Sequence, residues 1–133
     1  MNLHTYFSDQ TGLGVLSTTN ARGEVNGAVY ATPHVTGPDT IAFIMRDRLT
    51  RANLKENARA HYLFVENGQG FAGVRLHLTM IEEVQDDELI DSLSRRKLRT
   101  AKADGERFLV SFKVDKALEL IGGDEIGIPE EAH

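Results

Sequence analysis

Short segments of alternating or β-branched apolar residues, separated by tight turn signals, are the feature that most constrains the fold of this chain. Six such segments are expected to be strands, over residues 13–19, 24–35, 40–46, 59–66, 71–84 and 107–114. Turn-forming residues join most of them directly. Because only one short helical segment interrupts the first five strands, βαβ units are excluded and antiparallel pairing is favoured.

Helical periodicity is confined to three segments. The first predicted helix covers residues 2–10, where Leu3, Tyr6 and Phe7 share one face. The second covers residues 50–57, with Thr50 as its N-cap. The third and longest covers residues 86–102. The strands carry apolar residues on both faces. The pattern therefore predicts a mostly β protein, a closed or nearly closed antiparallel barrel with helices packed outside it.

Length and composition narrow the class of protein. With 133 residues and 41% hydrophobic residues, the chain is expected to form one domain over residues 1–133, with a loose tail from residue 122. The absence of cysteine excludes disulfides, thiolate metal sites and a cysteine nucleophile. A net charge of −5 argues against non-specific nucleic-acid binding. No segment has the features of a membrane span or a signal peptide, so we expect a cytoplasmic protein without a membrane partner.

Two sequence patterns that can indicate a ligand site are interpreted here as structural. Gly68, Gly70 and Gly73 match G-x-G-x-x-G, but a strand follows them instead of the helix that a dinucleotide site requires. The five histidines lack ligand spacing, and although His61 and His77 fall on neighbouring predicted strands, we interpret them as hydrogen-bonded barrel residues. The sequence therefore predicts no metal site.

Residues 46–53 carry the most chemical information. A predicted strand ends at Arg46, Arg48 follows, and a helix begins near Thr50 and Arg51. The free N–H groups at a helix start, flanked by guanidinium groups, suit a phosphate. The alternative is an ordinary capped helix with solvated arginines.

Four segments occur in a characteristic order: Val25–Tyr30, Phe43–Arg46, Thr50–Asn57 and Ala60–Phe64. Together they resemble the pyridoxamine 5′-phosphate oxidase-like family of FMN-binding split β-barrels. The resemblance covers about residues 10–84, and it implies an antiparallel six-stranded split β-barrel that binds FMN, as a homodimer.

The resemblance also implies the residues of the flavin site. The flavin ring would lie on the second strand, its phosphate at the helix start, and the end of the third strand between them. The implied contacts are Ala28, Val29 and Tyr30 for the ring, Met45 and Arg46 at the strand end, and Thr50, Arg51 and Asn53 for the phosphate.

The implied activity is that of an FMN-dependent oxidoreductase or electron-transfer protein with an unknown substrate or redox partner. The chain has no Trp, whereas pyridoxamine phosphate oxidases place a C-terminal Trp over their substrate, so pyridoxal phosphate synthesis is not expected. Catalytic residues are unknown; Tyr30 and His77 are candidates that also suit structural roles. Three alternatives remain: a non-catalytic flavoprotein, a split barrel that binds heme or a deazaflavin, and an interaction module.

Overall fold

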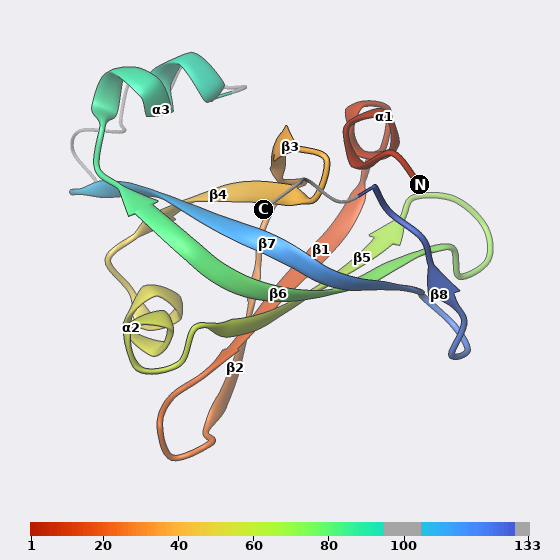
Figure 1. Ribbon diagram of the computed structural model, residues 1–133, viewed down its shortest axis with the longest axis horizontal. Helices are drawn as coiled ribbons and strands as arrows, with labels where there is room; N and C mark the ends of the chain where they lie inside the picture. The colour runs from red at the N-terminus through yellow and green to blue at the C-terminus, as the bar shows by residue number, and fades with distance from the viewer. Residues whose placement is uncertain (95–104, 130–133) are drawn as a thin grey trace.

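The computed structural model, which describes residues 1–94 and 105–129, is an antiparallel sheet curled into a barrel with helices at its periphery (Figure 1). The strands are β1 (Gly12–Thr19), β2 (Val25–Val29), β3 (His34–Gly37), β4 (Thr40–Arg46), β5 (Arg59–Glu66), β6 (Gly73–Val84), β7 (Arg107–Glu119) and β8 (Glu125–Ile126). The helices are α1 (Leu3–Ser8), α2 (Leu49–Glu56) and α3 (Asp87–Leu93).

The strands pair in the order β2-β1-β5-β6-β7-β4-β3, and β8 pairs with β7 outside this path. All of these pairings are antiparallel. Strands β2 and β3 are the two ends of the path, and residues 30–33 join them directly. The predicted class, a mostly β antiparallel barrel with few helices, is therefore confirmed.

The described residues form eight strands, whereas six strands were predicted for the chain. The predicted strand over residues 24–35 is divided into β2 and β3, and Pro33, which has no N–H to donate to a ladder, lies in the break. In addition, Glu125 and Ile126 pair with Leu118 and Ala117, so part of the segment predicted as a loose tail is a strand.

The helix ends also differ from the predictions. Helix α2 begins at Leu49 with Arg48 as N-cap, so the predicted N-cap Thr50 is wrong. Helix α3 ends at Leu93, where Ser94 turns extended and its N–H reaches the carbonyl of Ile90. The remainder of the predicted helix over residues 86–102 lies almost entirely outside the described residues.

The barrel interior is filled by aromatic side chains from several strands. Tyr62 and Phe64 of β5 stack with ring centroids 6.3 Å apart, and Phe43 of β4 lies 5.0 Å from Tyr62 and 6.0 Å from Phe112 of β7. Phe7 of α1 meets the same cluster. Within the described residues, no helix is long and apolar enough to cross a membrane.

Candidate functional site

The start of helix α2 is the part of the predicted site that the fold exposes to a ligand. Strand β4 ends at Arg46, and Arg48 takes an extended conformation before the helix begins. The exposed Arg48 side chain makes no capping hydrogen bond to the first turn. The first-turn N–H groups therefore lack the usual N-cap acceptor, which leaves them available to an anion.

Tyr30 joins this helix start from the end of β2. Its ring packs edge-on against Phe43, with centroids 5.6 Å apart, and its phenol lies close to the Thr50 side chain and to the charge of Arg48. Burial raises the pKa of Tyr30, while the Thr50 side chain and the charge of Arg48 oppose the rise. The phenol is thus neutral near pH 7. We call Tyr30, Arg48 and Thr50 the α2 entry site.

Arg51 points away from this site and is buried, with 9% of its surface exposed. Its guanidinium forms a bidentate pair with Glu83 of β6, at 2.8 and 3.0 Å, and a third bond with Asp47 at 2.9 Å. It also lies 3.6 Å from the ring centroid of Phe108. The alternative of solvated arginines therefore does not hold for Arg51, because two carboxylates and a ring contact its guanidinium. Its predicted contact with a phosphate would have to compete with these partners.

Three other predicted contacts also lie away from the entry site. Asn53 is buried and donates to the Thr18 hydroxyl at 3.1 Å, which ties α2 to β1. Met45 is 1% exposed and belongs to the barrel core. Arg46 donates to the Gly105 carbonyl at 3.0 Å.

Strand β2 offers an open surface beside the entry site. Val29 is 72% exposed and Val25 is 75% exposed, while Ala28 is half-buried and pairs with Leu16. A hollow of about 210 Å³ adjoins this surface, with Val25, Arg59 and His61 among its lining residues. The surface is therefore flat, apolar and open to solvent.

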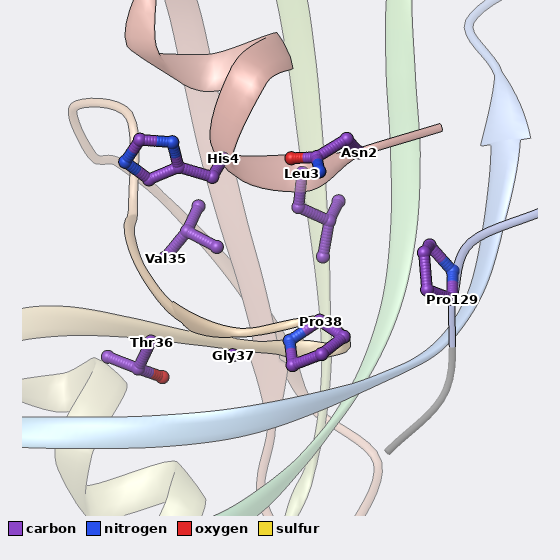
Figure 2. A pocket seen from close by; sticks show the side chains of 8 residues that line it. All are labelled: Asn2, Leu3, His4, Val35, Thr36, Gly37, Pro38 and Pro129. Carbon is purple, nitrogen blue, oxygen red and sulfur yellow. The ribbon is translucent and has the colours of Figure 1, made fainter.

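A second hollow, of about 430 Å³, lies at α1 between the β3–β4 turn and Pro129 (Figure 2). Its walls include Asn2, His4, Val35 and Pro38. None of the described residues that line it is a lysine or arginine. It therefore lacks the cation that a phosphate group would require.

Arg48 was expected beside the helix but was not among the predicted site residues, and Glu83 was not predicted at all. Its position two residues before Thr50 was a usable sequence signal for Arg48. Glu83 gave no local signal, because it lies 32 residues from Arg51 along the chain and the fold alone brings them together.

Comparisons with known proteins agree with this architecture. No protein-family profile and no curated protein matches the sequence. Among solved structures, an FMN-binding protein from Syntrophomonas wolfei superposes with a TM-score of 0.73 at 23% identity, covering 91% of this chain and 85% of that protein. The fold is that of the FMN-binding split barrels.

Two further structures share the fold at lower identity. A putative pyridoxamine 5′-phosphate oxidase from Lactobacillus delbrueckii has a TM-score of 0.64 at 16% identity, over 86% of this chain and 88% of its own. An F420 reductase has a TM-score of 0.63 at 14% identity, over 85% of this chain and 94% of its own. These likenesses confirm the predicted resemblance at the level of the fold.

Proposed function

We propose that this protein binds FMN, with the phosphate at the α2 entry site and the flavin ring along β2. The observation that carries the proposal is the convergence of Tyr30, Arg48 and Thr50 at a helix start without a side-chain cap. The split-barrel fold, shared with an FMN-binding protein, supports it.

The donor set fits a phosphate monoester. Backbone N–H groups at the start of α2 and the guanidinium of Arg48 are donors for a dianion, and a charge-assisted contact of this kind contributes about 1.5–3 kcal/mol. Thr50 orients Tyr30 at the edge of the site. Arg51 and Asn53, each engaged with β6 or β1, are proposed to position α2 and not to touch the phosphate.

The surface of β2 fits the ring. Val25 and Val29 present exposed apolar side chains on one face of the strand, with Gly27 between them, while Ala28 presents a small side chain on the opposite face. Arg46 would stand at the margin of the site, and Met45 behind it. A bound flavin would supply hydride or electron transfer. The neutral phenol of Tyr30 would donate a hydrogen bond to a ligand at this edge.

The protein is further proposed to act as a homodimer. Leu13, Val25 and Val29 expose 53%, 75% and 72% of their surface on the outer side of β1 and β2. A second copy covering these residues would remove the apolar patch from water and enclose the ring. The cytoplasmic location and an oxidoreductase activity remain predictions from the sequence.

A deazaflavin is the second candidate ligand. The similarity to an F420 reductase favours it, because that protein shares the same fold over 85% of this chain. FMN that stays unbound at micromolar concentrations, together with binding of a deazaflavin, would favour this second candidate.

The experiment is a pair of titrations, with FMN and with riboflavin, which lacks the phosphate. Arg48→Ala should raise the FMN dissociation constant roughly tenfold to a hundredfold and leave riboflavin binding unchanged. Arg22→Ala is the matched control, since Arg22 is an exposed arginine in the β1–β2 turn. Equal losses for both flavins in Arg48→Ala would contradict the phosphate assignment.

A further inference from the structure

Two histidines face each other on the outer surface of the barrel, apart from the α2 entry site. His61 of β5 and His77 of β6 are direct register partners, so both side chains leave the same face of the sheet. Their ring centroids are 5.0 Å apart and the ring planes are nearly perpendicular, at 88°. Both residues are half-buried.

Their ring nitrogens are not used within the described part of the chain. Neither imidazole makes a side-chain hydrogen bond to a described residue, which differs from the expectation of hydrogen-bonded barrel histidines. Since both side chains are only half-buried and neither ring nitrogen is among the fully buried unpartnered atoms of the described residues, these nitrogens can take a ligand from solvent.

The separation of the rings suits one shared metal ion. A metal about 2.0–2.1 Å from a ring nitrogen lies about 3.2 Å from the ring centroid. Two imidazoles that share an ion with tetrahedral geometry therefore have centroids about 5.2 Å apart, and about 4.5 Å apart at a right angle. The observed 5.0 Å falls between these two values.

The pair is open on the side of His61. The hollow of about 210 Å³ that borders His61 also reaches Ser17, the register partner of His61 on β1. Lys116 is the partner of His77 on β7. The nearby Arg75 is directed to the carbonyl oxygens of Glu119 and Gly122 at the end of β7.

The protonation state also favours a metal. Burial lowers the pKa of His61, and the neighbouring His77 and Arg75 lower it further. His61 is therefore neutral near pH 7, which is the form that binds metals. Binding does not have to displace a proton from it.

We propose that His61 and His77 chelate one divalent transition-metal ion of the zinc or nickel class. The described residues hold no group of three or more His, Cys, Asp or Glu that could complete the coordination, so water fills the other positions. An imidazole pair selects such ions over Mg²⁺ and Ca²⁺, which prefer oxygen ligands. The pair lies beside the β2 surface proposed for the flavin ring, because His61 and Val25 line the same hollow, but its ligands are different residues.

Calorimetric titration of Zn²⁺ into the full-length, tag-free protein near pH 7.5 tests the proposal, with Mg²⁺ as the comparison ion. Wild-type protein should bind one Zn²⁺ per histidine pair and no Mg²⁺. His61→Gln and His77→Gln should each weaken Zn²⁺ binding at least about tenfold, since even changes outside the ligand shell weaken metal binding about 10–100-fold. His4→Gln, on the exposed side of α1, is the matched control and should bind as wild type does.

A second measurement does not depend on how the variants fold. In wild-type protein, ¹⁵N chemical shifts of the imidazole nitrogens should change on Zn²⁺ addition for His61 and His77 and stay constant for His4. Zn²⁺ binding that persists in a variant carrying both His61→Gln and His77→Gln, or the absence of any shift at these two rings, would overturn the proposal.

Discussion

At the scale of single residues, two arginines show how this fold uses buried charge. Arg107 is 3% exposed and pairs with Asp91 at 2.7 Å and Asp87 at 3.1 Å, which ties α3 to β7. Arg51 is held in the same way by Asp47 and Glu83. A buried guanidinium requires its carboxylate partners, because an unpaired buried charge strongly destabilises the fold.

Arg51→Ala should therefore lower the stability of the fold, whatever it does to ligand binding. We expect a loss of about 2–3 kcal/mol in the free energy of unfolding, because the change removes the charged hydrogen bonds of a buried guanidinium and its packing on Phe108. Urea denaturation measures this. The control is Arg48→Ala, an exposed arginine three residues away, which should change stability by less than about 0.5 kcal/mol. Equal stability of the two variants would contradict the structural role of Arg51.

The same ion pair should make stability depend on pH. Hydrogen bonding to Arg51 lowers the pKa of Glu83 from its ordinary value of 4.5. A lowered carboxyl pKa contributes stability above the unfolded value, and this contribution is lost as the pH falls below about 4.5 toward the folded pKa. Urea unfolding between about pH 7 and about pH 3 should show a smaller acid-induced loss in Glu83→Gln than in wild type. Identical losses would show that the pair adds nothing.

At the scale of elements, local patterns predicted most of the secondary structure. The alternation of Phe108, Val110, Phe112 and Val114 identified β7, and the turn signals placed β4, β5 and β6 within a few residues. The errors fall at a helix start and in the shortest strand. Thr50 is no N-cap because α2 begins one residue earlier, at Leu49, which places Thr50 inside the first turn. Strand β8 has only two residues, too few to leave an alternating pattern.

The close approach of β1 to the barrel interior gives an element-scale prediction. A Cβ at Gly14 would lie 2.0 Å from the Tyr62 hydroxyl and 2.6 Å from the Tyr30 carbonyl. Gly14→Ala should therefore force β1 away from Tyr62 and destabilise the fold by about 1–3 kcal/mol, the usual cost of overpacking. Gly123→Ala is the control, since nothing lies within 4 Å of its Cβ. Thermal unfolding of both variants checks this, and a Gly14→Ala protein as stable as the control would contradict the packing.

At the scale of the whole molecule, a single copy of the chain leaves the apolar outer surface of β1 and β2 exposed to water. Val29→Lys should keep the barrel folded, since the side chain is 72% exposed, and should convert a dimer into a monomer. Phe71→Lys is a matched control, because Phe71 is 80% exposed in the β5–β6 turn outside this surface. Sedimentation velocity measures both. A wild-type protein that is already monomeric at micromolar concentration would contradict the proposed dimer.

The candidate site was predictable only in part, because the partners of several of its residues are brought together by the folded barrel and not by the local sequence. The sequence located the segment around Arg48 and Thr50, because a basic strand end followed by a helix start is a local pattern. It did not reveal that Arg51 and Asn53 turn inward, because their partners Glu83 and Thr18 come from distant strands. Which polar groups remain for a ligand is therefore decided by the assembled barrel.

The most direct test of the account is the chemical identity of any flavin that purified protein carries or takes up. Protein saturated with a flavin extract and freed of excess should, on denaturation, release FMN at close to one molecule per chain, identified by chromatography and absorbance. FMN should be retained in preference to riboflavin, because the α2 entry site is assigned to the phosphate. Release of no FMN, or retention of riboflavin equal to that of FMN, would contradict the proposed function.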